Sequence, residues 1–237
     1  MLEADQDSFK IDPYLYISQV VSKYFGRNLI VPSRDVVELA NKVISLDPNI
    51  SYDQLAGPFA HLYWQRNFWK AAYFFEHGPD PFLYERTIAA SVSPRVLVLG
   101  AGSAADTMAF MTWLNQKPPL GRNSKITLVD RSQRQLDLAQ EIIGITKPHL
   151  ASSHFDIEYQ NVDVASWEPQ PESADLILMS HFLTENPANL TSLLGRIRDA
   201  ARDRGKVVTI ERERDPIWEQ ARELLMDMGI HTLDMAI

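Results

Sequence analysis

Four stretches of the sequence place small, acidic or basic residues directly after apolar runs, and these residues are the candidates for chemistry. They are Gly100 to Gly102 after "VLVL", Asp130 after "KITLV", Asp163 after "FDIEYQNV", and Ser180 with His181 after "ADLILM". In an open parallel sheet, ligands bind at the carboxyl ends of the strands. We therefore expect the four stretches to meet at one site.

The glycine turn admits more than one ligand. Two glycines at a strand end let the backbone approach a ligand closely, and the helix that follows presents a partly positive N-terminus. The letters "GAGSAA" also fit the dinucleotide pattern G-x-G-x-x-A. No G-K-[ST] follows, which excludes a P-loop. The cofactor must therefore be decided by residues further along the chain.

Asp130 and Asp163 suit the two halves of a nucleoside. A carboxylate at Asp130 can accept hydrogen bonds from both hydroxyls of a ribose. The alternative is that Asp130 caps the helix that begins near Ser132. Asp163 lies in a polar turn after the third strand, where an acid can accept a hydrogen bond from an adenine amino group.

From Arg95 to Ile237 the chain resembles the class I S-adenosylmethionine-dependent methyltransferases. The resemblance is carried by four segments in the family's order, followed by a fifth strand: "VLVLGAGSA", "KITLVDRSQRQLDLAQ", "NVDVASW", "ADLILMSHFLTE" and "RGKVVTIERE". In this family the glycine turn contacts the amino acid part of the cofactor, the two acids take ribose and adenine, and the segment after strand four faces the acceptor.

The resemblance implies a set of cofactor-binding residues and one candidate for catalysis. The cofactor residues are Gly100, Ala101, Gly102, Asp130, Arg131, Asp163, Val164 and Ser180. His181 is the candidate catalytic base. Val98 and Ala104 depart from the family pattern, which often has an acid and a third glycine at these two positions.

Methyl transfer from a sulfonium requires alignment of the acceptor and exclusion of water, and it needs a base only when the acceptor must lose a proton. We expect O- or N-methylation of a small or medium-sized acceptor, with S-adenosylmethionine as cofactor and no metal. One alternative is a nicotinamide-dependent oxidoreductase. Another is a non-catalytic module with the methyltransferase fold that binds the cofactor or a partner.

The elements that position these residues form an α/β fold. The pattern predicts a Rossmann-like, mostly parallel sheet flanked by helices over residues 91–237 and a helical N-terminal cap or lid over residues 1–90. The expected strands are 95–99, 125–130, 155–161, 175–180, 206–211 and 231–237. The expected helices are 33–48, 59–77, 104–113, 132–143, 188–202 and 216–228.

The family's sheet ends in a two-strand hairpin, and one of those strands is missing from this sequence. Either the chain is a fragment of a longer protein, or another element, such as one from a second subunit of a homodimer, completes the sheet edge. The aromatic segment from Phe59 to His77 should be a core helix or should line an acceptor pocket.

Composition limits the partners. The chain of 237 residues carries 31 acids and 23 bases, a net charge of -8, which disfavours nucleic acid. It has no cysteine, which fits a reducing compartment, and the polar start "MLEADQDSFK" is unlike a secretion signal. No apolar run approaches the ~20 residues that cross a bilayer. We therefore expect a cytoplasmic protein with no membrane partner.

Overall fold

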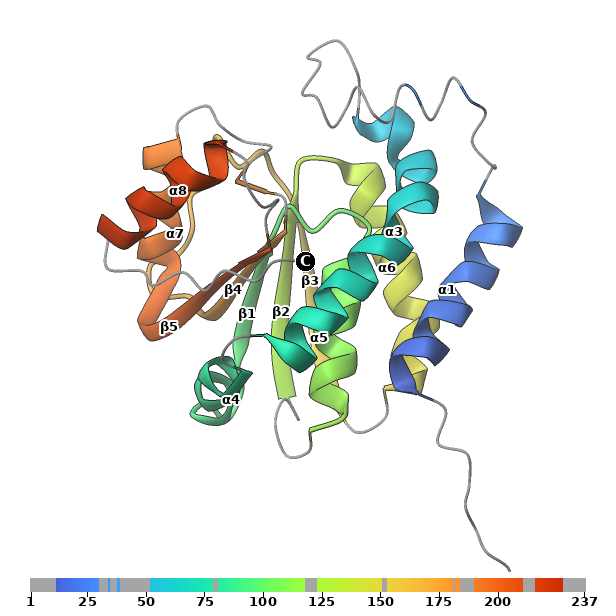
Figure 1. Ribbon diagram of the computed structural model, residues 1–237, viewed down its shortest axis with the longest axis horizontal. Coiled ribbons are helices and arrows are strands. Elements are labelled where there is room, and N and C mark those ends of the chain that lie inside the picture. The colour runs from blue at the N-terminus through green and yellow to red at the C-terminus, as the bar shows by residue number, and fades with distance from the viewer. Residues whose placement is uncertain are drawn as a thin grey trace, which may run out of the picture.

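The computed structural model describes residues 12–29, 52–78, 81–117, 123–150, 153–180, 182–183, 190–210 and 216–227, with positions 34 and 38. Its centre is a sheet of five parallel strands in the order β3-β2-β1-β4-β5 (Figure 1). The strands are β1 Arg95–Leu99, β2 Asn123–Asp130, β3 His154–Asn161, β4 Ala174–Ser180 and β5 Ala201–Ile210. The predicted α/β class and Rossmann-like sheet are confirmed.

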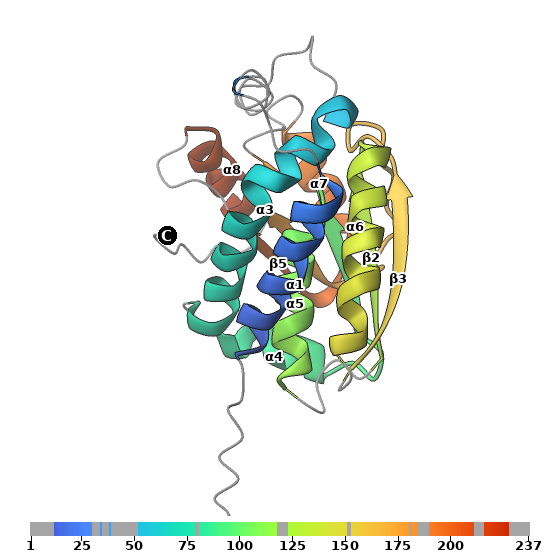
Figure 2. The ribbon, with the colours of Figure 1, turned by 90° about the vertical axis from the view of Figure 1, so that its right-hand side faces the viewer.

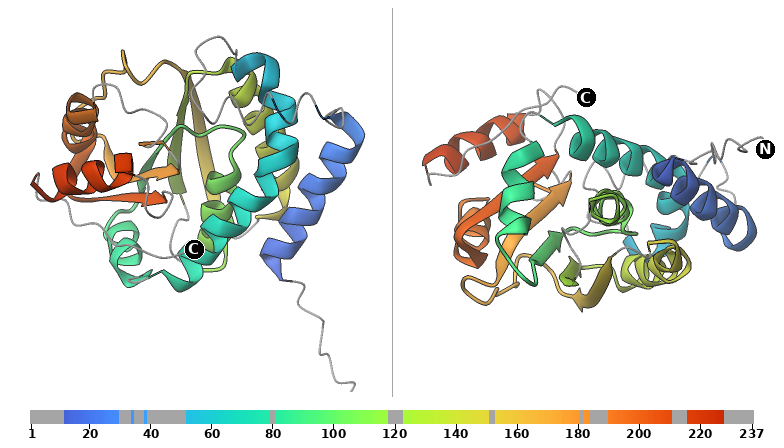
Figure 3. Two further views of the ribbon diagram at one scale, coloured as in Figure 1. Left: turned by 45° about the horizontal axis from the view of Figure 1, so that its top comes forward. Right: turned by 90° about the horizontal axis from the view of Figure 1, so that it is seen from below.

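Helices cover both faces of this sheet (Figure 3). They are α1 Pro13–Asn28, α3 Tyr52–His77, α4 Pro81–Ala89, α5 Ala105–Asn115, α6 Gln133–Thr146, α7 Leu190–Ala200 and α8 Pro216–Asp227, with a 3₁₀ turn at Lys147–His149. Helix α1 lies outermost, against α3, α5 and α6 (Figure 2). Helices α7 and α8 lie together on the other side of the sheet.

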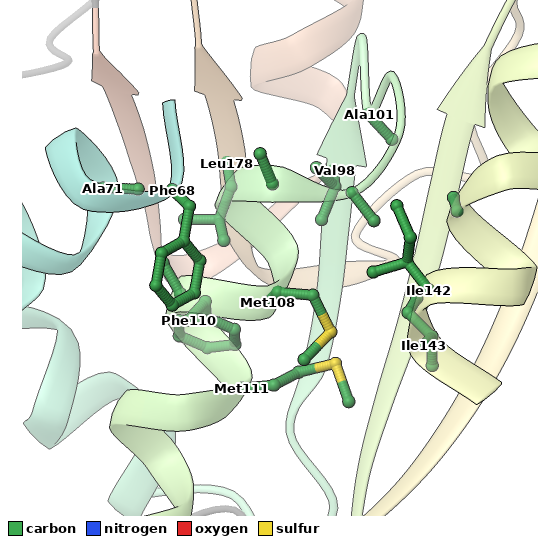
Figure 4. Packing of buried hydrophobic residues seen from close by; sticks show 14 of the residues in the cluster. Phe68, Ala71, Val98, Ala101, Met108, Phe110, Met111, Ile142, Ile143 and Leu178 are labelled. Carbon is green, nitrogen blue, oxygen red and sulfur yellow. The ribbon is translucent and has the colours of Figure 1, made fainter. Parts of the chain in front are cut away.

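The alternation of side chains along the central strands produces two hydrophobic clusters. On β1, Val96 and Val98 face the cluster beneath α3, α5 and α6, whereas Leu97 and Leu99 face the cluster beneath α7 and α8. Figure 4 shows the first cluster, where Val98 lies near Met108 of α5 and Ile142 of α6. Apolar residues at every strand position are typical of a parallel sheet that is covered on both faces.

Helix α3 buries one stripe of its surface in the first cluster. Its buried residues recur at helical spacing: Ala56, Ala60, Trp64, Phe68, Ala71, Ala72, Phe74 and Phe75. The rings of Trp64 and Phe68 stack with centroids 4.9 Å apart. Because this cluster also contains residues of α1 and of the sheet, the N-terminal helices share a core with the sheet. The division into domains near residue 90 stays a prediction.

Several predicted boundaries were wrong. Helix α3 begins at Tyr52 and continues through Pro58, where a start after the proline was expected. The helix expected to run to Arg202 ends at Ala200, and Ala201 already pairs with Ala174 in the sheet. The strand expected from 231 to 237 lies outside the described residues, as does the helix from 33 to 48 except for positions 34 and 38.

Candidate functional site

The turn after β1 alternates between left-handed and other backbone conformations. Gly100, Gly102 and Ala104 have φ values of 65°, 50° and 63°. The N–H groups of Gly100 and Ala101 donate to the carbonyl of Val129 at the end of β2, at 2.9 and 3.1 Å. A left-handed conformation at three alternate positions explains why the turn needs glycine or a very small residue. Ala104 therefore occupies a position whose geometry suits the family's third glycine.

The two glycines have different surroundings. A Cβ added at Gly100 would lie 2.5 Å from Cδ2 of Phe182, whereas a Cβ added at Gly102 would meet no atom of the described residues within 4 Å apart from its chain neighbours. The backbone of Gly100 is thus packed against protein. Gly102 instead leaves open space beside the turn, where a ligand can approach the backbone.

Asp130 holds this turn in place. Its Oδ2 accepts a hydrogen bond from the Gly102 N–H at 2.8 Å, and its Oδ1 accepts one from the Ser132 N–H, also at 2.8 Å. Burial raises the pKa of the Asp130 carboxyl above its ordinary value, although the two N–H groups and the charge of Arg131 oppose the rise. Each carboxylate oxygen keeps a lone pair for a ligand hydroxyl.

The cap of α6 is Ser132, whose side chain accepts from the Gln135 N–H at 3.2 Å. Asp130 is therefore not the helix N-cap that the alternative interpretation proposed. Asp53 of α3 adds to this cap, because its Oδ1 accepts hydrogen bonds from the Ser132 hydroxyl at 2.5 Å and from the Arg134 N–H at 3.2 Å. The start of α3 is thus fastened to the start of α6.

A cavity of about 280 Å³ opens beside the turn, close to the lower limit of the ~300–1,000 Å³ typical of ligand pockets. One wall is the carboxyl edge of the sheet with the starts of α5 and α6. The opposite wall is α3. Trp64 connects the walls, because its indole N–H donates to the carbonyl of Ser103 at 3.0 Å. The cavity lies where β1 and β4 lead into helices on opposite faces, which is the usual ligand position in such sheets.

Most of the predicted cofactor residues line this cavity. They are Gly100, Ala101, Gly102, Asp130, Arg131, Val164 and Ser180. Asp163 is exposed and does not line it, although Val162 and Val164 on either side do. Oδ1 of Asp163 accepts from the Ala165 N–H at 2.8 Å, so this carboxylate shapes the turn after β3. His181 lies outside the described residues. The role of each residue toward a cofactor stays a prediction.

Sequence reasoning did not identify the individual residues of the α3 wall. Besides Ala60 and Trp64 of the buried stripe, five residues of this helix line the cavity: Phe59, Tyr63, Arg66, Asn67 and Lys70. Their spacing places them along one side of α3, next to the buried stripe. The helix therefore does both things expected of an aromatic segment, since one face is core and the adjacent face lines a pocket. The alternation of aromatic and polar residues at helical spacing was the available signal.

Gln135 of α6 was also missed. It lines the cavity with only 5% of its surface exposed, and its Oε1 accepts no hydrogen bond from the described part of the protein. A buried amide without a partner is costly, so its position beside a cavity is informative. The spacing from Ser132 to Gln135 matches a capping box, a pattern that by itself favours a structural role for Gln135.

The residues present fit a nucleoside cofactor with an amino acid tail. The open space at Gly102 leaves room for a ligand against the backbone. Asp130 offers acceptor positions for ribose hydroxyls, and the apolar side chains of Val162 and Val164 suit the faces of a base.

Among the described residues, no group of three or more His, Cys, Asp or Glu side chains could hold a metal ion. In the same part of the chain, no helix combines the length and apolar character needed to cross a membrane.

Comparisons with known proteins agree with this geometry at the level of the fold. No family model and no curated protein matches the sequence. Among solved structures, the trans-methyltransferase CalH, solved in complex with S-adenosylhomocysteine (SAH), superimposes with a TM-score of 0.52 at 17% identity over 80% of this chain. The matched region covers 51% of the CalH chain, so this chain spans about half of it.

A second similar structure is a proposed S-adenosyl-L-methionine-dependent methyltransferase from Methanococcus maripaludis. It has a TM-score of 0.49 and 14% identity, over 76% of this chain and 74% of the other. The sheet order, the glycine turn and the superposition on CalH together define the class: this chain has the fold of the class I S-adenosylmethionine-dependent methyltransferases.

Proposed function

We propose that this protein is an S-adenosylmethionine-dependent methyltransferase that acts on oxygen or nitrogen of a small or medium-sized acceptor. The observation that carries the proposal is the convergence of the strand ends. Gly100 and Gly102 after β1, Asp130 at the end of β2 and Ser180 at the end of β4 line one cavity, opposite α3. This convergence supports a single nucleoside site with an adjacent acceptor space.

In this proposal the chain binds the cofactor, orients the acceptor and encloses both. The turn at Gly100 to Gly102 holds the amino acid part of S-adenosylmethionine, Asp130 with Arg131 holds the ribose, and Asp163 with Val164 lies at the adenine end. The cofactor supplies a methyl group on a sulfonium, and an acceptor lone pair takes this methyl as the C–S bond breaks and its electrons return to sulfur. The α3 wall orients the acceptor and excludes water.

We further propose His181 as the base when the acceptor is a hydroxyl. The residue follows Ser180 directly, and Ser180 lines the cavity. A neutral imidazole would take the hydroxyl proton as the oxygen attacks, so His181→Ala should lower turnover by roughly 10² to 10⁴-fold with SAH affinity unchanged. A pH profile of turnover tests this role, because a base with the ordinary histidine pKa of ~6.5 gives an acid limb that the variant lacks. Identical profiles and rates would remove His181 from the site.

The decisive experiment compares nucleosides by thermal shift. S-adenosylmethionine and SAH at ~100 times their dissociation constants should stabilise the fold by roughly 2.7 kcal/mol, and NADH should not. Stabilisation by NADH alone would establish the oxidoreductase alternative instead. Binding of SAH without turnover on any member of an acceptor panel would favour the non-catalytic module.

The N-terminal helices are proposed to act as the lid of this site. Helix α3 provides one wall of the cavity, and its residues from Phe59 to Lys70 include seven that line it. Hydrogen exchange across residues 59–75 should slow when SAH and acceptor are both bound. Equal hydrogen exchange in the free and bound states would show that α3 is part of the hydrophobic core and does not act as a lid.

A further inference from the structure

The α3 wall is the cationic side of the cavity in an acidic protein. Arg66 and Lys70 are one helical turn apart and both line the cavity, with Asn67 between them. The chain as a whole has a net charge of -8. Arg66 is exposed and makes no ion pair with the described residues. A guanidinium at the edge of a cavity that forms no ion pair within the described part of the chain can bind an anion through two parallel N–H groups.

The same wall has an aromatic portion next to the cations. Tyr63 and Phe59 lie about one and two turns before Arg66 and line the cavity, with ring centroids 4.8 Å apart. Both rings are half-buried, so part of each ring faces the cavity. This wall therefore offers an apolar surface that continues into positive charge along one face of one helix.

The acids that line the cavity belong to the opposite wall. Asp130 is at the end of β2, and Asp106 is in the first turn of α5. No acid of α3 lines the cavity among the residues that the structure describes there. The acids that line the cavity therefore all lie on the wall proposed for the cofactor, together with Arg131, whereas the α3 wall left for the acceptor presents two cations and, among the described residues, no acid.

From this separation we propose that the acceptor carries a carboxylate or phosphate next to an apolar, ring-sized portion. Arg66 and Lys70 bind the anionic group, and Phe59 and Tyr63 cover the apolar portion. The proposal rests on the proposed function, since it needs a nucleoside on the opposite wall. An anion that reaches these cations could also be the carboxylate of the cofactor, so the experiment must separate the two sources.

The test uses phenylacetate and phenyl phosphate as anionic probes and phenylacetamide as the neutral match, titrated by NMR into the protein saturated with SAH. The anionic probes should bind at least tenfold more tightly than the amide. The double variant Arg66→Gln/Lys70→Gln should lose roughly tenfold in affinity for the anions and none for the amide, as expected for exposed charged contacts. Arg27→Gln, an exposed position on α1, is the matched control and should change nothing.

Two results would overturn the inference. One is equal affinity for phenylacetate and phenylacetamide in the wild-type protein. The other is a double variant that loses affinity for SAH and keeps affinity for 5′-methylthioadenosine, which lacks the amino acid, because the cations would then hold the carboxylate of the cofactor. If SAH does not stabilise the wild-type protein at all, the proposed function fails, and that result is distinct from both.

A separate observation concerns Gln135. In a capping box the glutamine side chain returns to the N–H of the cap residue, here Ser132. That N–H already donates to Oδ1 of Asp130 at 2.8 Å, so the usual partner of Gln135 is taken. The Oε1 atom is left without a hydrogen bond from the described residues, in a side chain that is 95% buried and lines the cavity beside Asp130 and Arg131.

We infer that the Gln135 amide hydrogen-bonds to the nucleoside part of the bound cofactor. Replacement by an apolar side chain of similar size should then have opposite effects on the free and bound protein. Gln135→Met should leave the melting temperature of the free protein unchanged or raise it, because an unsatisfied amide is removed. Its affinity for SAH should fall by roughly three- to tenfold.

Gln133→Met is the matched control, because Gln133 is in the same helical turn, is exposed and bonds to Asp137. This variant should keep wild-type affinity for SAH. A lower melting temperature for free Gln135→Met with unchanged SAH affinity would make Gln135 a structural cap and overturn the inference.

Discussion

The two walls of the cavity are built from different parts of the chain. The sheet wall is built around the backbone turn from Gly100 to Ser103, which left-handed positions bend, together with side chains such as Asp130 that follow the strand ends. The α3 wall presents only side chains, on a helix whose other face is buried in the core. The first wall is defined by the local geometry of a turn, and the second depends on how α3 packs. We therefore expect substitutions in the sheet wall to act on the cofactor and those in the α3 wall to act on the acceptor.

Gly102→Val should give the largest effect on cofactor binding. The new side chain would enter the open space beside the turn, and a β-branched residue at φ 50° would also strain the backbone by roughly 1–3 kcal/mol. SAH affinity should fall by more than about 100-fold, equivalent to ~2.8 kcal/mol, with the protein still folded. Calorimetry with SAH and a melting curve measure the two effects.

Gly100→Ala tests whether the two glycines of the turn have different roles. Its methyl group would collide with Phe182 instead of the ligand, so the main loss should be stability, roughly 1–3 kcal/mol. If the two glycine variants lost SAH affinity and stability in the same proportion, the distinction between a packed and an open glycine would be wrong.

Asp130→Ala should give the next largest loss of SAH affinity. The variant loses the charged acceptor for the ribose and leaves the N–H groups of Gly102 and Ser132 without their partner. SAH affinity should fall roughly tenfold to 100-fold, and the free protein should lose about 1–3 kcal/mol of stability. Unchanged affinity with lower stability would show that Asp130 only supports the turn.

Cofactor affinity should depend on pH through Asp130. Ribose hydroxyls donate to the ionised carboxylate, so binding lowers its pKa, whereas burial raises that pKa in the free protein. Affinity should therefore be complete above the raised pKa and should fall, by at most about tenfold per pH unit, as the pH drops through it. Calorimetry from pH 3 to 8 measures this. Asp130→Asn should lack this dependence, and a midpoint at the ordinary aspartate value of ~3.9 would contradict the effect of burial.

Trp64→Phe should give the smallest change in cofactor binding. It removes the hydrogen bond that joins the walls and leaves the Ser103 carbonyl without its donor, which should cost about 1–2 kcal/mol of stability. SAH affinity should fall less than roughly threefold, because the turn keeps its bonds to β2. Trp218→Phe, in the cluster beneath α7 and α8, is the control and should leave SAH affinity unchanged. A tenfold loss in Trp64→Phe would show that α3 and the turn act as one unit.

The elements that depend on local patterns were predictable from the sequence. Strand β1 was expected at the residues where it lies, and the ends of β2, β3 and β4 were also correct, because apolar runs end at polar or glycine residues. These strand ends place most of the predicted cofactor residues at the cavity. Asp163 is the exception, because its carboxylate turns to the Ala165 N–H.

The features that were missed depend on tertiary contacts. Pro58 favours a helix start, but Ala56 and Ala60 on either side of it are buried, and this packing continues α3 back to Tyr52. Ala201 and Arg202 suit a helix locally, yet they extend β5, and Ala201 pairs with Ala174 of β4. The Oε1 of Gln135, which accepts no hydrogen bond from the described residues, follows from competition by Asp130 for a single N–H group, which no spacing rule reveals.

The position of Trp64 allows ligand binding in the cavity to be followed by tryptophan fluorescence. It is the only tryptophan among the residues that line the cavity in the described structure, and it is 1% exposed, whereas Trp69 on the same helix is 39% exposed. Indole emission depends on the polarity around the ring and on its hydrogen bond, and Trp64 has both a stacked phenyl ring and the Ser103 carbonyl as neighbours. A ligand that displaces water from the cavity should therefore shift the blue component of the intrinsic fluorescence. Occupancy of the site can thus be followed in real time without a label and before any acceptor is known.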